Sequence, residues 1–404
     1  MEKRDFLHFL TVFLFFKKEL CPFFLSMGNR FAIQNSSKRQ SEQSNHLTTS
    51  TTFENLKSLP IALHQSQCVL HKHELLICGG YLQRNCYSYH TIKNEYKFIC
   101  EYPNDITLLG HCVVKMINNK NKDNNNEITL LSFGGSLFIK RHTLIMKYVS
   151  VWSNKNINDK ENYNQWIPFT DNHNYPIIIG RDKDLYQGVR AIIDKKNSNL
   201  LFITYRRNNI SVFDFNTFQF IKHDILPTDN WIQFHCFVSI SKSKSKNLKE
   251  KKYEMLLFCY DTGLLIQYYK DYNTFQFYKI SVCNDISRFN GYAYLCIHNI
   301  ILFFGGWNDT FGNNTIFSKS IHTYSIQENK WTTFQNILPS TLYDCAAILS
   351  EDNIYMHIIG GRNDKNVTLS THMKTKVRIW NDSQLVIFYF YFLIKHKYIL
   401  YCMK

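Results

Sequence analysis

The run IILFFGGWND, residues 300–309, shows the pattern that decides the fold, an apolar strand that ends in two glycines. Five more strands of this kind follow the same design, three with the glycine pair and two without it: ELLICGG (74–80), ITLLSFGG (128–135), MHIIGGRND (356–364), LLFITY (200–205) and MLLFCYDTG (255–263). The six strands end 46 to 70 residues apart. A strand pattern that recurs at such a period predicts a repeat protein with six similar units.

Each unit has further strands before and after this one. An apolar strand with His or Cys precedes it, as in GHCVVK (110–115), and strands with alternating aromatic residues follow it, as in ISVFDFNTFQFI (210–221). The pentapeptide NTFQF occurs at 216–220 and again at 273–277, which are 57 residues apart. Alternating β-branched and aromatic residues with Asn, Asp and Gly turns predict antiparallel sheet, and hardly any segment has helical periodicity.

The glycine pairs have a structural explanation. Each pair ends a buried strand where the chain turns close to a neighbouring unit, and glycine permits a positive φ and a close approach of backbones. Neither a GxGxxG motif nor a phosphate-loop GK[ST] motif accompanies the pairs, so nucleotide binding is not expected. The eight structural glycines are Gly79, Gly80, Gly134, Gly135, Gly305, Gly306, Gly360 and Gly361.

Aromatic residues complete a pattern that resembles the kelch-repeat family, in which Gly-Gly is followed by an aromatic residue and a Trp with six residues between them. Pairs with this spacing, some with another aromatic in place of the Trp, are Tyr324 and Trp331, Tyr89 and Tyr96, and Phe213 and Phe220. The resemblance covers residues 51–380. It implies an all-β fold, a six-bladed kelch-type β-propeller like the central domain of galactose oxidase.

Two units depart from the kelch pattern. The fourth has seven residues between Tyr269 and Phe277, and the second has an insertion rich in Asn and Lys before Trp166. The resemblance is specific for the fold and weak for function, because propellers of this kind serve many roles.

Ring closure can be predicted from the two ends of the pattern. TFENLKSLPIALHQSQCVL (52–70) matches TFQNILPSTLYDCAAIL (333–349), in which the leading stretch is an outer strand. After KTKVRIW (374–380) no matched outer strand follows, so residues 51–56 are expected to complete the sixth blade and to remove two free sheet edges. An outer strand at 385–392 is the alternative. The predicted domains are an N-terminal extension (1–50) that is disordered, the propeller (51–380) and a hydrophobic C-terminal tail (381–404).

The net charge of +15 at first indicates a nucleic-acid partner. Segments 1–52, 241–252 and 373–404 carry net charges of +3, +5 and +5, so the rest of the chain is nearly neutral. Basic residues in tails and in a Lys/Ser run are typical of solvated loops, and no nucleic-acid partner is expected. Twelve cysteines without a CxxC motif indicate reduced thiols and a cytoplasmic protein.

Both termini contain short apolar runs, at 6–16 and 385–394. They are too short to span a bilayer as a helix. Lys17 and Lys18 follow the first run where a signal peptide would have a cleavage site. Membrane association through these runs stays open, as does a reading frame that is extended at its ends.

No catalytic or metal-binding constellation stands out, so neither a cofactor nor a metal is expected. His71 and His73 alternate on one strand without carboxylate support and are interpreted as surface histidines. His111, His235 and His322 start strands and are expected to hydrogen-bond to loops, and the Asp-rich stretch 171–184 is expected to be an interblade loop. The copper site of galactose oxidase has no residue-by-residue match in this chain.

The function favoured by the sequence is a non-enzymatic protein–protein interaction module, a scaffold or adaptor that presents loops to a partner protein. The family resemblance implies a ubiquitin-ligase or cytoskeletal component as partner, although no BTB or F-box domain is evident. The alternative is a propeller enzyme, oxidase-like, with a central-channel site. The candidate partner-binding residues follow the Gly-Gly strands or their equivalents, where a ring of Arg can hold carboxylates: Arg84, Arg141, Arg207 (with Arg206), Trp307 and Arg362.

Overall fold

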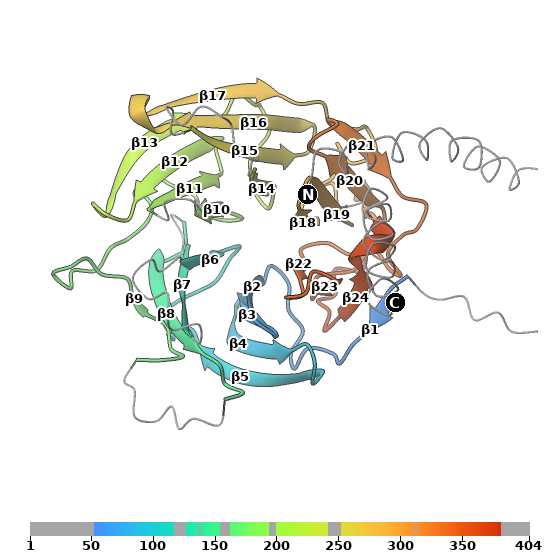
Figure 1. Ribbon diagram of the computed structural model, residues 1–404, viewed down its shortest axis with the longest axis horizontal. Coiled ribbons are helices and arrows are strands. Elements are labelled where there is room, and N and C mark those ends of the chain that lie inside the picture. Colours follow the sequence, from blue (N-terminus) through green and yellow to red (C-terminus); the bar gives the residue numbers. More distant parts are fainter. Residues whose placement is uncertain are drawn as a thin grey trace, which may run out of the picture. The chain divides into compact units, whose positions relative to one another are not determined.

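The computed structural model describes residues 52–116, 127–136, 139–153, 162–193, 199–240, 252–310, 312 and 314–380. These residues form six four-stranded sheets. Figure 1 shows the sheets arranged as blades around a central axis. The prediction of an all-β, six-bladed β-propeller is confirmed. The predicted N-terminal extension (1–50) and C-terminal tail (381–404) lie outside the described residues.

Within each blade the strands are named A to D from the axis outwards. Blade 1 has β2 (Gln67–His71), β3 (Glu74–Gly80), β4 (Gln83–His90) and β5 (Glu95–Glu101), and blade 2 has β6 (Cys112–Met116), β7 (Glu127–Gly134), β8 (His142–Val149) and β9 (Ile167–Pro168). Blade 3 has β10 (Arg190–Ile193), β11 (Leu200–Tyr205), β12 (Asn209–Asp214) and β13 (Gln219–Ile225), and blade 4 has β14 (Cys236–Ser239), β15 (Lys252–Cys259), β16 (Thr262–Tyr269) and β17 (Thr274–Lys279). Blade 5 has β18 (Ala293–Ile297), β19 (Ile300–Phe304), β20 (Ile321–Ser325) and β21 (Lys330–Thr333), and blade 6 has β22 (Ala346–Leu349), β23 (Tyr355–Ile359), β24 (His372–Lys376) and β1 (Glu54–Asn55).

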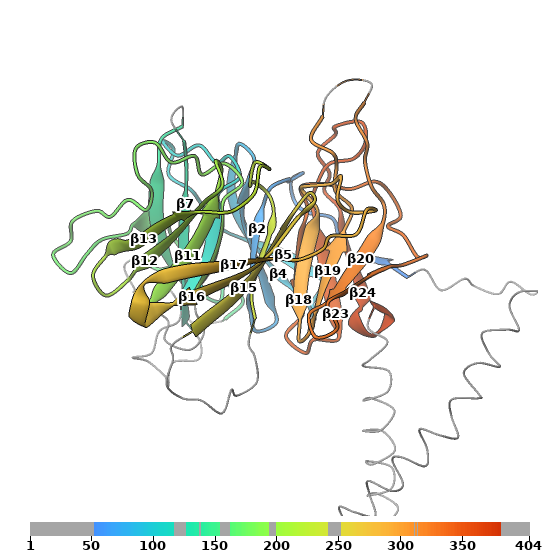
Figure 2. The ribbon, with the colours of Figure 1, turned by 90° about the horizontal axis from the view of Figure 1, so that it is seen from above.

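The antiparallel pairing sorts the loops onto two faces of the ring. The loops from strand B to strand C and the connections from strand D to the next strand A leave the blades on one face, which we call the B–C face. The A–B and C–D turns, including the short 3-10 helix η2 (Lys270–Tyr272), lie on the opposite A–B face. Figure 2 shows the ring from the side, with loops on both faces of the blades. Each strand A therefore begins at the B–C face, next to the axis.

Strand B is buried on both sides in the blades that show the pattern most clearly. Every residue of β11 is buried, and so is every residue of β3. The two faces of β11 pack against different blades, because Phe202 shares a core cluster with Leu257 of blade 4 and Ile203 shares one with Phe133 of blade 2. A strand with two buried faces needs a continuous apolar run, which explains why these strands stand out in the sequence.

The glycine pairs lie where neighbouring blades approach each other. Gly305 has a φ of 67°, and a Cβ atom there would lie 2.0 Å from the carbonyl oxygen of Leu342. Gly360 has a φ of 64°, and its Cβ would lie 2.3 Å from the carbonyl oxygen of Leu63. Both oxygens belong to the connection that enters the next blade of the ring. The structure therefore agrees with the proposed role of the pairs in a close turn against a neighbouring blade.

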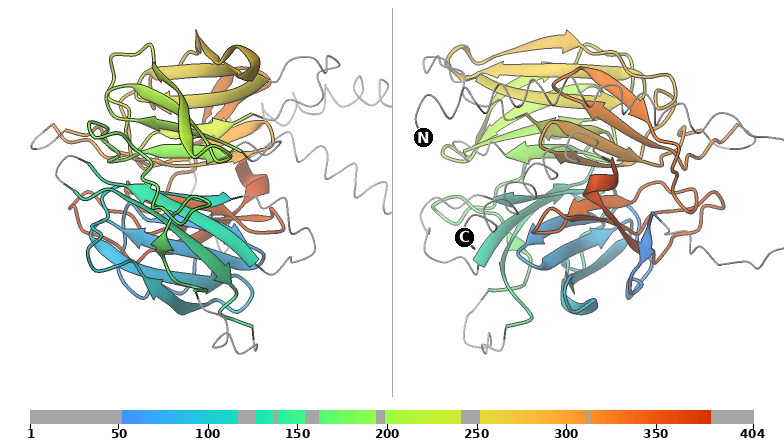
Figure 3. Two further views of the ribbon diagram at one scale, coloured as in Figure 1. Left: turned by 90° about the vertical axis from the view of Figure 1, so that its left-hand side faces the viewer. Right: turned by 45° about the vertical axis from the view of Figure 1, so that its right-hand side comes forward.

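The N-terminal strand closes the ring, as predicted. β1 is the outer strand of blade 6 and pairs with β24, with Glu54 opposite Lys374. Figures 1 and 3 show β1, in blue, beside the red strands of blade 6. The Phe53 ring lies 5.7 Å from the Trp380 ring, which ends the 3-10 helix η3 (Val377–Trp380) after β24. The alternative strand at 385–392 lies outside the described residues, and β1 occupies the position it would have taken.

The register of the hairpins corrects two details of the repeat. Tyr268 stands opposite Phe275, just as Phe213 stands opposite Phe220, so the fourth unit keeps the six-residue spacing with Tyr268 and Phe275 rather than Tyr269 and Phe277. The two NTFQF copies are consequently shifted by two residues relative to the structural repeat. A shift of two residues keeps every side chain on the same face of a strand, so both copies fit.

Candidate functional site at the axial mouth of the B–C face

Six residues with a positive φ, one before each strand A, form a collar around the axis: Gln65 (φ 56°), Gly110 (59°), Gly188 (70°), Phe234 (48°), Gly291 (61°) and Asp344 (53°). Backbone hydrogen bonds join neighbouring members, from Gly188 N to Gly110 O (2.9 Å), Phe234 N to Gly188 O (2.9 Å), Asp344 N to Gly291 O (2.7 Å) and Gln65 N to Asp344 O (2.8 Å). Each bond runs from one blade back to the preceding blade. The collar therefore fixes the spacing of the inner strands at the mouth of the channel.

In three blades the residue after the collar position anchors its blade to the preceding blade. His111 Nε2 donates to the carbonyl oxygen of Cys78 in β3 at 3.1 Å, and Tyr292 Oη donates to the carbonyl oxygen of Phe258 in β15 at 2.7 Å. His235 Nε2 is hydrogen-bonded to Thr204 Oγ1 in β11 at 2.6 Å. Burial lowers the pKa of His111 to about 3, so this anchor is neutral at physiological pH.

The expectation that His111, His235 and His322 bond to loops is wrong, because all three partners lie in strands. His322 Nδ1 is hydrogen-bonded to Thr333 Oγ1 of β21 at 3.0 Å. His71 is also not a surface residue, since it is buried and its ring lies edge-on to that of Tyr148 at 5.7 Å. His71, His111 and His235 thus contact a neighbouring blade, whereas His322 joins two strands of blade 5.

A polar network from several blades covers part of the axial mouth. Asp309, from the B–C loop of blade 5, accepts hydrogen bonds through Oδ2 from Gln233 Nε2 (2.9 Å) and from Tyr260 Oη (3.1 Å) of blade 4. On blade 3, Arg206 Nη1 donates to Gln187 Oε1 at 2.9 Å. Burial lowers the pKa of the Arg206 guanidinium, and the nearby charge of the Asp309 carboxylate partly opposes that decrease. Loops far apart in the sequence are thereby joined at the axis.

Asp344 is a buried carboxylate with one unused oxygen. Its Oδ2 accepts a hydrogen bond from Gln65 Nε2 at 2.9 Å, while Oδ1 has no partner among the described residues. Oδ1 lies close above Gly291, where a Cβ atom would approach it to 2.8 Å. Burial raises the pKa of Asp344 to about 6, and the charges of Arg190 and Arg362 oppose that increase. The group is therefore poised to bind or release a proton near neutral pH.

Two of the five predicted partner-binding residues come together beside Asp344. The Trp307 ring lies 5.0 Å from the Tyr343 ring and 6.3 Å from that of Phe317. Arg362 pairs with Tyr343 through backbone hydrogen bonds in both directions. Burial raises the pKa of Tyr343, and the charge of Arg362 partly opposes that increase. Trp307 and Arg362 are both half-buried, so they form a wall of the mouth rather than a projecting loop.

Arg84 and Arg141 already form hydrogen bonds and ion pairs with residues near them. Arg84 donates to the carbonyl oxygen of Tyr102 at 3.0 Å and pairs with Glu101 at 3.2 Å. Arg141 donates to the carbonyl oxygen of Asp184 at 3.1 Å, and only 15% of its side chain is exposed. Both guanidinium groups hold the connection to the next blade in place, so few of their N–H donors are left for a partner.

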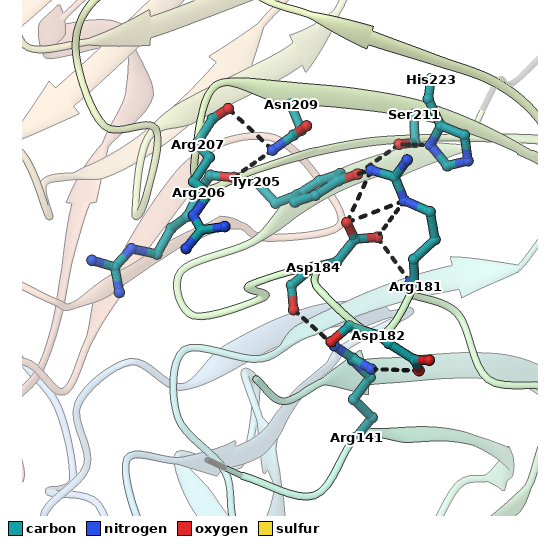
Figure 4. Close-up of polar contacts among 10 residues, drawn as sticks. All are labelled: Arg141, Arg181, Asp182, Asp184, Tyr205, Arg206, Arg207, Asn209, Ser211 and His223. Carbon is teal, nitrogen blue, oxygen red and sulfur yellow. Dashed lines mark hydrogen bonds and ion pairs between the residues drawn. The ribbon is translucent and has the colours of Figure 1, made fainter. Parts of the chain in front are cut away.

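Figure 4 shows how this part of the face is held between blades 2 and 3. Arg181 Nη2 lies 3.0 Å from Asp184 Oδ1 and 3.1 Å from Tyr205 Oη. The chain of contacts continues from Tyr205 Oη to Ser211 Oγ (3.0 Å) and on to His223 Nδ1 (2.7 Å). The Asp-rich stretch 171–184 is an interblade loop, as expected, and its last carboxylate binds an arginine of the same loop.

Arg207 and a tryptophan that the sequence reasoning missed are both accessible on the B–C face. Arg207 lies exposed at the tip of the β11–β12 turn. Trp231, in the connection that enters blade 4, is 61% exposed, and the Arg206 guanidinium lies 4.9 Å from its ring. A tryptophan in the polar stretch TDNWIQ outside any strand was the available signal. Arg190 and Asp344 were missed as well, because both look like ordinary strand residues in the sequence.

Within the described ranges, no three His, Cys, Asp or Glu side chains are grouped closely enough to hold a metal ion. The same part of the chain has no helix that is long and apolar enough to cross a bilayer.

Comparisons with known proteins show the fold alone. No protein-family model matches the chain, and no curated protein matches it either. Among solved structures, the one titled "Structure of YjhT" has a TM-score of 0.52 and 11% sequence identity, and the match covers 78% of this chain and 95% of that one. A chain in "Crystal Structure of Mitotic Checkpoint Complex" has a TM-score of 0.44 and 8% identity, with coverages of 85% and 98%. The first of these similarities agrees with the propeller architecture.

Proposed function

We propose that this chain is a kelch-type propeller that acts as a non-enzymatic protein-interaction module and binds a partner protein on its B–C face. The observation that carries the proposal is Trp231, which is 61% exposed on this face and lies 4.9 Å from the Arg206 guanidinium. Trp and Arg are the residue types that contribute most to binding energy at protein interfaces. A cation–π pair also holds the ring in one orientation, so it provides a rigid anchor for a partner.

Further exposed apolar side chains on the connections of this face support the proposal. Tyr175 is 70% exposed, Ile178 49%, Leu82 56% and Ile337 52%. Such side chains gain free energy when a partner removes them from water. The collar and the interblade anchors beneath them keep the platform rigid, which lowers the entropy cost of binding.

Arginines give the proposed surface a preference for carboxylates. Arg207 is exposed beside Arg206, and a guanidinium can hold a carboxylate through two parallel hydrogen bonds. An acidic segment of a ubiquitin-ligase or cytoskeletal component is therefore the partner class that we favour for this scaffold or adaptor. Arg84 and Arg141 support the loops of this surface, whereas Trp307 and Arg362 would contact a partner that reaches the axis.

A test compares variants of the two faces in the full-length chain. Trp231→Ala is expected to lose the proteins that co-purify with the wild type, whereas Tyr272→Ala is expected to retain them. Tyr272 is a matched control because it is 69% exposed but lies in η2, on the A–B face. Quantitative mass spectrometry of the co-purified proteins is the measurement. Equal recovery with both variants would refute binding at this face.

An enzyme with a central-channel site is the second candidate, and one observation favours it. Asp344 has a pKa of about 6, raised by burial, and an unpartnered oxygen at the channel mouth. Those are properties of a general acid or base. Among the described residues, no nucleophile or second acid–base group is hydrogen-bonded to that oxygen, so binding remains the function that the geometry supports best.

A further inference from the structure

A small chamber of about 210 Å³ lies in the channel directly below the collar. Ser66, Tyr292 and Cys345 line it, and each of them directly follows a collar residue. Among the described residues that line the chamber, Arg190 carries the only charge. The chamber is therefore a part of the axis with one fixed cation in its wall.

The charge of Arg190 is an exception in the repeat. Arg190 is the first residue of β10 and stands opposite Thr204 of strand B. The residues at the equivalent position of the other inner strands, each opposite strand B in the same register, are uncharged: Gln67, Cys112, Cys236, Ala293 and Ala346. Five blades thus build the channel without a charge at this level. The architecture of the blade does not require an arginine here.

The guanidinium of Arg190 has unused hydrogen-bonding capacity. Nη1 donates to the carbonyl oxygen of Val189 at 3.0 Å, and the group lies 5.9 Å from the ring of Phe234. A guanidinium has five N–H donors in a fixed fork. No carboxylate of the described residues forms an ion pair with it. Most of its donors therefore remain available on the channel side.

The thiols around Arg190 do not neutralise its charge. Burial raises the pKa of Cys112 to about 11 and that of Cys68 and Cys345 to about 12, so all three are protonated at neutral pH. A protonated thiol is a poor hydrogen-bond acceptor. Within the part of the chain that the structure describes, the cation in the chamber consequently has no ion-paired anionic partner.

An oxygen without a partner lies at the collar end of the chamber. Ser66, which lines the chamber, is only 4% exposed, and its Oγ has no hydrogen-bond partner among the described residues. The charge of Arg190 acts on the pKa of Asp344, so the two groups lie near each other without forming an ion pair. Buried polar groups are rarely left unpaired, which makes a bound ligand or water the natural partner.

We infer that the chamber binds a small organic carboxylate, with its carboxylate on Arg190 and a hydrogen-bond donor of the same ligand toward Ser66. The planar fork of a guanidinium matches the two oxygens of a carboxylate. A chamber of about 210 Å³ suits a ligand of a few heavy atoms. A protein segment is too large, so this site is independent of the partner surface proposed above.

The lower channel provides a route to the chamber. A larger space of about 1110 Å³ adjoins it, since both are lined by Cys68 and Val113, and it reaches His298 and Asn299 in the A–B turn of blade 5. Its walls are mostly aliphatic, and Lys115 is the charged residue among the described ones that line it. A cation along an otherwise apolar route attracts an anion toward Arg190.

The experiment titrates the full-length protein with three probes of similar size in ligand-observed NMR: glycolate, acetate and glycolamide. Glycolate is expected to bind in the millimolar range, acetate more weakly because it lacks the hydroxyl donor, and uncharged glycolamide not measurably. Arg190→Gln is expected to weaken glycolate binding by about tenfold or more, the usual effect of losing a charged hydrogen bond. Arg378→Gln, an exposed arginine of η3 that lines neither the chamber nor the larger space, is the matched control and should leave the affinity unchanged.

Two results would overturn the inference. One is the absence of carboxylate binding to the wild type at these concentrations, and the other is equal glycolate affinity in the wild type and in a folded Arg190→Gln variant. The unfolding midpoint of each variant shows whether it is folded. If Arg190→Gln does not fold, Arg190→Lys replaces it, because Lys keeps the charge but loses the fork and should still weaken glycolate relative to the wild type.

Discussion

Residues in the left-handed region hold this propeller together at its tightest points. Besides the collar, asparagines with positive φ occupy the C–D turns of blades 1, 4 and 5, and each of these three accepts a hydrogen bond from a tyrosine five residues earlier. Tyr89 Oη donates to Asn94 Oδ1 and Tyr268 Oη to Asn273 Oδ1, both at 2.9 Å. Asn tolerates this conformation better than other residues with a side chain. The Tyr-x4-Asn spacing is thus a sequence signal for the turn between strands C and D.

Gly305→Ala is expected to destabilise the fold by about 3 kcal/mol, because it combines a left-handed conformation with a backbone clash. The added Cβ would lie 2.0 Å from the carbonyl oxygen of Leu342, which belongs to the connection into the next blade and cannot easily move. The free energy of unfolding in urea is the measurement.

Gly312→Ala is the matched control for this substitution. Gly312 also has a positive φ, of 85°, but no atom lies within 4 Å of its added Cβ. It should lose only about 1 kcal/mol, the cost of the conformation itself. Equal losses in the two variants would mean that the contact with the neighbouring blade is unimportant.

At the scale of the element, β1 covers a sheet edge although it is only two residues long. It covers the outer edge of blade 6, and the segment after it continues along the blade with hydrogen bonds from Leu56 N to His372 O (2.8 Å) and from Leu59 N to Ser370 O (3.0 Å). An uncovered edge would present unpaired backbone groups to other chains. The closing contact thus protects the ring as well as joining its ends.

Phe53→Ala is expected to destabilise the protein by about 3 kcal/mol, as for other large-to-small changes in a core. Phe53 is 7% exposed and packs on Trp380, so its loss removes the main apolar contact of the closing segment. The control is Ile92→Ala, a residue that is 71% exposed in a turn of blade 1 and should change stability by no more than about 0.5 kcal/mol. Denaturant unfolding of both variants provides the comparison, and indistinguishable midpoints would argue against closure by this segment.

At the scale of the whole molecule, buried histidines make stability depend on pH. Burial lowers the pKa of His64, His142 and His357 from 6.5 to about 4 in the folded chain, and that of His111 to about 3. Between these values and 6.5, the unfolded chain binds protons that the folded chain does not. Stability therefore falls as the pH decreases through this window.

The denaturation midpoint is accordingly expected to fall steeply from pH 7 to pH 5. Each of these histidines costs up to about 1.4 kcal/mol for every pH unit within the window. Asp344 acts in the opposite direction, because its pKa is raised to about 6, but it is a single group. Urea unfolding measured across this range tests the expectation, and a flat profile would contradict it.

The repeat, the number of blades and the strand that closes the ring could all be predicted from the sequence. They could be predicted because strands with two buried faces require continuous apolar runs, and because glycine pairs mark close turns. The sequence also identified the Arg-rich loops, yet it could not distinguish the arginines. Arg84 and Arg141 support neighbouring loops, whereas Arg190 looks like any other strand residue until the six inner strands are compared in register.

The three-dimensional fold decides which side chains lie together at the axis. Residues as far apart in the chain as Gln65 and Asp344 become hydrogen-bonded there, and Arg190 comes to face the channel between uncharged neighbours. Local sequence patterns report the face of a strand on which a side chain lies, and they carry no information on the side chains of other blades that it faces. Ring closure brings the starts of all six inner strands to one point, and that point is where we propose that a small carboxylate binds.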